Sequence, residues 1–278
     1  MKISVRAFTL VELFVVVAII GVLVSLAFSA SQSMLKSARS AAEISAGRTL
    51  IAAYLAGAQD NGGILLAGYD DKARGYTHPA LGPISDAAAH RYPYRLAPYF
   101  DYGLNGTILV NRNASQIKRF GFPSWEYGVS LCPALGMNAY FVGGSYELGV
   151  LDMPGECATR LAQVGKPSSM LVFASAGMGS ESGGDKVDGF HRVEPPAKHV
   201  DLWTGPDDAK DVPPASYGNV DFRYNGRAVC VFLDGSIRLL APKDLRDMRL
   251  WNKNAQDSNN PNYRVPIAPP PPGRGNGR

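Results

Sequence analysis

The stretch FTLVELFVVVAIIGVLVSLAFSASQSML, residues 8–35, decides how this chain is built. After Glu12 it carries no charged side chain up to Leu35. A helix rises about 1.5 Å per residue, so this run is long enough to cross a hydrocarbon core about 30 Å thick. It exceeds the roughly 7–15 apolar residues of a signal peptide, which favours a retained anchor. Glu12 supports that choice, because a carboxylate at the start of a membrane span is costly unless it is paired, and is usually functional.

The residues around Glu12 resemble a known processing site. Phe8-Thr9-Leu10-Val11-Glu12 follows a short basic leader ending at Ala7, and it resembles the prepilin cleavage and methylation motif of type IV pilins and type II secretion pseudopilins. The resemblance implies cleavage between Ala7 and Phe8 by a prepilin peptidase and N-methylation of Phe8. It also implies that Glu12 acts in assembly by pairing with the terminal amine of a neighbouring subunit, which makes its burial tolerable. The family favours Gly before the cut, so Ala7 predicts slower processing.

The helix is expected to continue beyond the apolar run. Apolar residues recur at spacings of three and four over residues 36–62, as in an amphipathic helix. Charged residues fall mostly between the apolar positions: Lys36, Arg39, Glu43 and Arg48. Asn61-Gly62-Gly63 is a helix-ending signal, so we expect one helix from about Phe8 to about Asp60.

The remainder predicts a mostly antiparallel β head and, with the helix, an α+β fold of pilin-like type. Strands are expected at 107–111, 170–174, 228–233 and 236–240. Asp234-Gly235 joins the last two runs and is the best hairpin signal in the chain. The role of residues 69–119 remains unassigned.

This hairpin carries a second resemblance. Tyr224, nine residues and then Asp234-Gly235 resemble the H-x(9)-D-G processing-associated module of pilin-like proteins. The residue that names the module is His, and here it is Tyr224. A metal or proton role of that His is therefore not transferred to this chain.

The sequence also sets domain boundaries. After residue 250 apolar periodicity is lost, and the end of the chain is rich in Asn, Pro and Gly, which predicts a disordered tail. The expected parts are a leader (1–7), a transmembrane helix (8–35), its amphipathic continuation (36–62), a head (63–250) and the tail (251–278).

Little in the head suggests catalysis or a cofactor, and we expect no enzyme. His191 and His199 lack metal-ligand spacing, which predicts a surface loop. Calcium is the alternative to no cofactor, because carboxylates crowd a Gly/Pro-rich region. Its candidate ligands are Asp185, Asp188 and Asp201. Cys132 and Cys157 lie in loop sequence and form the candidate disulfide, whereas Cys230 lies in an apolar run and is expected to be a buried thiol.

These features predict a structural subunit of a secretion pseudopilus or a type IV pilus-like filament. The expected partners are prepilin peptidase, other pilin subunits, an inner-membrane assembly platform and membrane lipid. The chain would cross the bacterial inner membrane once, with a cytoplasmic N-terminus and a periplasmic head. Its net charge of +4 is spread thinly, which excludes a nucleic-acid stripe. The alternative is a minor tip or adhesin subunit in which the Tyr-rich residues 69–102 bind a polymer or partner.

Overall fold

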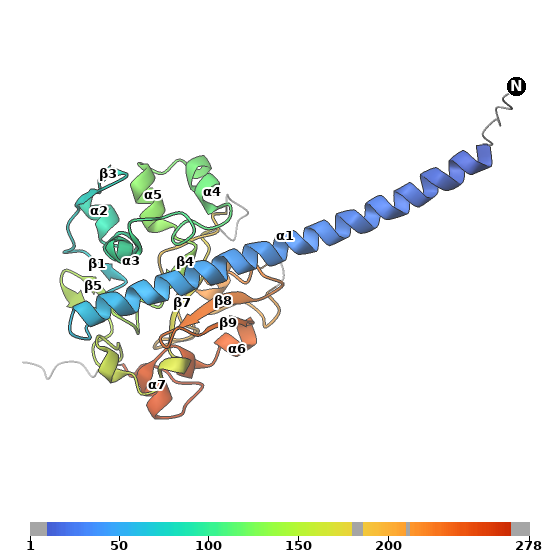
Figure 1. The fold of residues 1–278 in the computed structure, drawn as a ribbon. Helices are drawn as coiled ribbons and strands as arrows, with labels where there is room; N and C mark the ends of the chain where they lie inside the picture. Colours follow the sequence, from blue (N-terminus) through green and yellow to red (C-terminus); the bar gives the residue numbers. More distant parts are fainter. Residues whose placement is uncertain (1–9, 180–185, 210–211, 268–278) are drawn as a thin grey trace, which may run out of the picture. The chain divides into compact units, whose positions relative to one another are not determined.

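A computed structural model describes residues 10–179, 186–209 and 212–267 (Figure 1). The first element is the helix α1 (Leu10–Asp60). Its end agrees with the predicted signal: Gly62 and Gly63 have positive φ, and the Gly63 amide donates to the Ala58 carbonyl over 2.7 Å. The chain divides into two units, Met1–Ala41 and Ala42–Arg278, and the head belongs to the second.

A four-stranded antiparallel sheet forms the centre of the head. Its strands, in spatial order, are β4 (Leu135–Met137), β7 (Leu171–Ser175), β8 (Ala228–Phe232) and β9 (Ile237–Leu240). The predicted hairpin is confirmed as β8–β9, with Ala228 opposite Leu240 and Val231 opposite Ile237. Gly235 adopts φ +87°, a backbone conformation that side chains disfavour, which explains the Asp-Gly turn.

The rest of the head is less β-rich than expected, so the chain is mixed α+β. Small sheets are formed by β1 (Tyr69–Asp70) parallel to β5 (Ser145–Glu147), β5 antiparallel to β6 (Val150–Leu151), and β2 (Thr77–His78) antiparallel to β3 (Gly82–Pro83). Short helices are α2 (Asp86–Ala89), α3 (Tyr92–Leu96), α4 (Asn113–Phe120), α5 (Trp125–Leu131), α6 (Pro242–Leu245) and α7 (Lys253–Asp257). Single 3-10 turns are η1 (Ala97–Phe100), η2 (Leu161–Gln163), η3 (Pro167–Ser169), η4 (Pro214–Tyr217) and η5 (Met248–Leu250). The strand predicted at 107–111 is wrong: the Leu104 carbonyl accepts the amides of both Ile108 and Leu109, which closes a turn before α4.

The two inner strands of the central sheet, β7 and β8, are buried on both faces. In β8, Val229 and Val231 belong to one buried cluster, whereas Ala228, Cys230 and Phe232 belong to another. Successive strand residues point to opposite faces, so both sets of side chains are covered. A strand buried on both sides reads as a continuous apolar run, which is why residues 228–233 predicted it.

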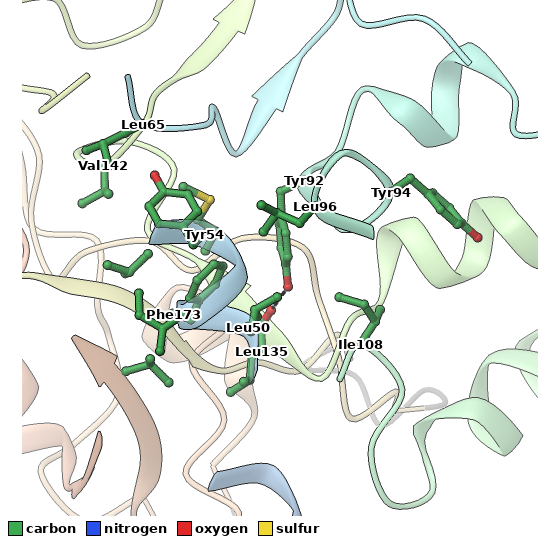
Figure 2. Close-up of a cluster of buried hydrophobic side chains, with 14 of the residues drawn as sticks. Leu50, Tyr54, Leu65, Tyr92, Tyr94, Leu96, Ile108, Leu135, Val142 and Phe173 are labelled. Carbon is green, nitrogen blue, oxygen red and sulfur yellow. Dashed lines mark hydrogen bonds between the residues drawn. The ribbon is translucent and has the colours of Figure 1, made fainter. Parts of the chain in front are cut away.

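The head half of α1 packs in the first of these clusters (Figure 2). Leu50 and Tyr54 are wholly buried, and the Tyr54 ring meets Phe173 of β7 edge-on with centroids 5.6 Å apart. Tyr92 of α3 lies against the same Phe173 and donates its hydroxyl hydrogen to the Leu135 carbonyl of β4. Each fully buried side chain of this size contributes about 1.5–3 kcal/mol.

The predicted disordered tail is wrong for residues 251–267. Trp251 is wholly buried, its ring meets Trp203 edge-on at 5.9 Å, and its Nε1 donates to the Leu245 carbonyl over 2.8 Å. Asn252 caps the N-terminus of α7, its side chain accepting the Asn254 amide hydrogen over 2.7 Å. Ring contacts and side-chain hydrogen bonds such as these, rather than a periodic apolar face, order this segment. The head therefore extends to residue 267. Residues 268–278 of the predicted tail lie outside the described residues.

Candidate functional site

The apolar part of α1 is the first candidate site. Residues Leu10–Phe28 are long and apolar enough to span a membrane, and none of this segment is buried in the structure. Its large side chains are exposed, including Phe14 at 72% and Leu26 at 62%. Glu12 lies in the first turn of this helix. The predicted processing residues Ala7 and Phe8 lie outside the described residues.

The second candidate site is a buried charge in the head half of α1. Glu43 is only 1% exposed, although the sequence pattern grouped it with charged residues that fall between apolar positions. It stands four residues before Gly47 and seven before Leu50, and so lies on the buried face of the helix. This spacing is the signal that sequence reasoning missed.

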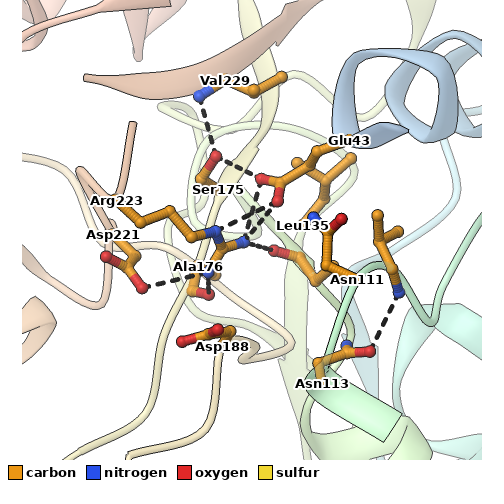
Figure 3. A network of polar contacts seen from close by, with 12 residues as sticks. Glu43, Asn111, Asn113, Leu135, Ser175, Ala176, Asp188, Asp221, Arg223 and Val229 are labelled. Atoms are coloured by element: carbon orange, nitrogen blue, oxygen red, sulfur yellow. Dashed lines mark hydrogen bonds and ion pairs between the residues drawn. The ribbon is translucent and has the colours of Figure 1, made fainter. Parts of the chain in front are cut away.

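Glu43 is held by three side chains from the sheet and the loop before β8, and Figure 3 shows two of them, Arg223 and Ser175. Arg223 Nη2 lies 2.9 Å from Oε2 and 3.0 Å from Oε1 of Glu43. The Tyr224 hydroxyl donates to Oε2 over 2.6 Å, and the Ser175 hydroxyl donates to Oε1. Ser175 in turn accepts the Val229 amide hydrogen over 2.8 Å, so the cluster connects α1 to both β7 and β8.

The remaining donors of Arg223 are also used. Nη1 donates to the Ala176 carbonyl over 2.8 Å and to Asp221 over 3.1 Å, and Nη2 donates to the Ala134 carbonyl over 2.9 Å. Burial by itself lowers the pKa of Arg223, but the Glu43 and Asp221 carboxylates outweigh it and hold that pKa above its ordinary value. Arg223 therefore stays protonated, and its contact with Glu43 is a structural ion pair.

The residues of the H-x(9)-D-G resemblance separate into two roles. Tyr224, at the position of the module's His, binds Glu43, and burial followed by the nearby Glu43 charge raises its pKa. Asp234 instead accepts the Ser236 amide hydrogen over 2.9 Å inside the turn that contains Gly235. Tyr224 thus belongs to the ion-pair cluster, whereas Asp234 and Gly235 shape the hairpin.

Two of the calcium candidates are occupied by arginines. Asp188 pairs with Arg112 over 2.7 Å, and Asp201 pairs with Arg264 over 2.8 Å. Burial raises the pKa of Asp188, but the hydrogen bond from Arg112 and the charges of nearby Arg and Lys side chains together outweigh burial, and the pKa is lowered. Asp185 lies outside the described residues. Across 10–179, 186–209 and 212–267, no group of three or more His, Cys, Asp or Glu side chains is placed to hold a metal ion.

The cysteines and histidines correct two further predictions. Cys132 and Cys157 are buried free thiols, so the candidate disulfide is not formed in this structure, and Cys230 is a buried thiol as expected. His199 is exposed, but His191 is only 7% exposed rather than on a surface loop. Burial, more than the neighbouring arginines, lowers the pKa of His191 well below its ordinary value.

The Tyr-rich residues 69–102 serve mainly as packing. Tyr92 and Tyr94 are wholly buried, and the Tyr76 hydroxyl donates to the Tyr94 carbonyl over 2.9 Å. His78 is also buried and meets Tyr102 edge-on at 5.2 Å. Tyr92, Tyr94 and His78 therefore offer no free surface for a partner, whereas Tyr76 and Tyr102 are half-buried.

Comparisons with protein-family models, curated proteins and solved structures found no match to this chain.

Proposed function

We propose that this chain is a prepilin-like structural subunit that is anchored by α1, processed before Phe8 and assembled into a pseudopilus or type IV pilus-like filament. The head is extracytoplasmic and catalyses no reaction. Glu12 pairs with the terminal amine of a neighbouring subunit after processing. The motif at residues 8–12 and the apolar run behind it support each of these steps.

One observation carries the proposal: the side chains of α1 are exposed in its first part and buried in the head in its last part. Its segment Leu10–Phe28 exposes large apolar side chains, whereas Glu43, Leu50 and Tyr54 of the same helix are buried in the head. Exposed apolar side chains of this kind each gain about 1.5–3 kcal/mol when they are transferred from water to an apolar surrounding. Lipid supplies that surrounding before assembly, and the helices of other subunits supply it within a filament.

A tip or adhesin role has less support. In that role the Tyr-rich residues 69–102 would bind a polymer or partner, but Tyr92 and Tyr94 are wholly buried in the core. Packing accounts for these rings, so the filament-subunit role is the one we propose.

The test is mass spectrometry of the full chain coexpressed with a prepilin peptidase. We expect a mature chain that begins at N-methyl-Phe8, and Ala7→Gly should increase the processed fraction. An intact Met1, or cleavage after Ala27 or Ala30, would refute processing of the pilin type.

Assembly is tested separately with Glu12. Glu12→Val should insert into the membrane and be processed, yet be absent from sheared filaments, because it cannot pair with the neighbouring amine. Glu12→Asp keeps the charge and is the matched control, and it should retain part of the assembly. Equal amounts of wild type and Glu12→Val in the filaments would show that the carboxylate has no role in assembly.

A further inference from the structure

The turn between α4 and α5 carries an aromatic and basic surface that the proposed function does not use. It comprises the side chains Lys118, Phe120, Phe122, Trp125 and Tyr127, here named the 118–127 patch. All five are exposed or half-buried. They lie at the end of α4 and the start of α5, two helices that pack against each other (Figure 1).

The aromatic side chains of the patch are held in place rather than loose. Phe120 and Phe122 stack with their centroids 4.6 Å apart and their planes 19° apart, yet Phe120 is 42% exposed. Ser124 caps α5 by accepting the Tyr127 amide hydrogen over 3.3 Å, which fixes the turn that carries both rings. Phe120 is thus exposed apolar surface in a fixed position, whereas Phe122 is half-buried and also packs against the core.

The patch is also positively charged. Lys118 Nζ lies 5.4 Å from the Trp125 ring centroid, and the Arg91 guanidinium lies 4.7 Å from that of Tyr127. Within the described parts of the chain, neither cation forms an ion pair with a carboxylate. Between Asp101 and Glu147 the sequence has a single acidic residue, Glu126, against Lys118, Arg119 and Arg112, the last of which pairs with Asp188.

We propose that the 118–127 patch docks the head on an anionic lipid surface. Trp and Tyr prefer the level of the lipid headgroups, exposed Phe enters the acyl boundary, and Lys and Arg bind anionic headgroups. The chain lacks the long basic stripe that a nucleic acid needs, whereas one lysine beside clustered aromatic rings suits a bilayer.

The part of α1 that joins the apolar segment to the head keeps the head near the bilayer, so a weak affinity of the patch for lipid is enough for docking. Only about 15 residues separate Phe28, the end of the apolar segment, from Glu43, the first buried residue of α1 among those whose burial the structure describes. A tether this short keeps the head at a high effective concentration beside the bilayer. The inference therefore rests on the anchoring part of the proposed function and is independent of processing and filament assembly.

Trp125 gives a direct readout of docking. The chain has three tryptophans, and Trp203 and Trp251 are only 5% and 0% exposed, so Trp125 is the accessible one. The full chain would be placed in nanodiscs that contain lipids with brominated acyl chains, with and without an anionic phosphatidylglycerol fraction. We expect bromine quenching of tryptophan emission in the anionic discs only. It should disappear in Trp125→Phe and weaken in high salt.

Two variants with matched controls test the residues. At a lipid composition where half the heads are docked, Lys118→Glu should lower the docked-to-undocked ratio at least fivefold, the factor equivalent to about 1 kcal/mol per basic residue at an anionic surface. Phe120→Ser should also lower it. Lys243→Glu and Leu148→Ser change an exposed lysine and an exposed leucine elsewhere on the head and should leave it unchanged.

Quenching that does not depend on Trp125, on anionic lipid or on the patch variants would overturn the proposal. A Trp125 emission shift with a soluble polyanion, without quenching in any disc, would also overturn it and identify a polymer site instead. A chain that does not co-elute with the discs would remove the tether and overturn it too. Co-elution is read before fluorescence, so that failure of anchoring is distinguished from failure of docking.

Discussion

Glu43→Ala is the substitution that tests the buried ion pair most directly. It removes a carboxylate that is 1% exposed and that accepts hydrogen bonds from Arg223, Tyr224 and Ser175. Arg223 would keep its bonds to two carbonyl oxygens and to the Asp221 carboxylate but lose its bidentate partner inside the protein. Removing one partner of a buried pair costs about 3–5 kcal/mol, and because Asp221 still contacts Arg223 we expect the free energy of unfolding of the head to fall by about 3 kcal/mol, the lower end of that range.

The assay is urea unfolding of the full chain in non-ionic detergent, followed by the emission of the buried Trp203 and Trp251. Glu147→Ala removes an exposed carboxylate and is the control, expected to stay within about 0.5 kcal/mol of wild type. Glu43→Leu combined with Arg223→Met should recover most of the loss, because a well-packed apolar pair often replaces a buried ion pair without cost. A loss below about 1 kcal/mol for Glu43→Ala, or a double variant as unstable as the single one, would refute the reasoning.

Three further predictions concern packing, pH and thiol reactivity. Gly47→Ala places a Cβ 2.8 Å from Val231 Cγ2, so it should lower the free energy of unfolding of the head by about 1–3 kcal/mol in the same urea assay. An unchanged urea midpoint would contradict the close approach of α1 to β8. Because burial lowers the folded-state pKa of His191, the unfolded chain binds its proton more readily, so this contribution to stability is full above about pH 6.5 and is lost as the pH falls. His191→Gln should remove that pH dependence between pH 7.5 and 5, and an identical dependence in both proteins would assign it to other groups. Burial raises the pKa of Cys132 and Cys157 to about 12, so these thiols should resist alkylation at pH 8 while the protein is folded. In urea without reductant, all three cysteines of the chain should react. A single reactive cysteine in urea would instead show that the other two form a disulfide.

Elements whose structure depends on neighbouring residues could be predicted from the sequence. The β8–β9 hairpin follows from two apolar runs around Asp234-Gly235, and its register is the one that this turn selects. The end of α1 follows from Gly62 and Gly63, which adopt the positive φ that favours glycine.

Features that depend on distant partners were mispredicted. Glu43 is neutralised by Arg223, 180 positions later, and helical periodicity alone carries no information about that partner. The order of residues 251–267 depends on Trp251 meeting Trp203, so a polar segment with little periodicity still packs. His191 is buried for a similar reason: its segment, rich in Gly and Pro, passes beside β4, where the Met137 amide donates to its carbonyl over 3.1 Å.

The Glu43 cluster does more to fix how α1 sits on the sheet than to stabilise the head. A buried ion pair offers little stability over an apolar pair of the same shape, but it tolerates far less displacement. Gly47 lies four residues after Glu43 on the same helix face, with its backbone close against Val231 of β8. Sliding the helix by one residue would rotate both positions by about 100°, withdrawing Glu43 from Arg223 and bringing a residue with a side chain against Val231. In the observed register the Glu43–Arg223 pair is intact and no side chain clashes with Val231. These two contacts together select which residues of the helix belong to the head core.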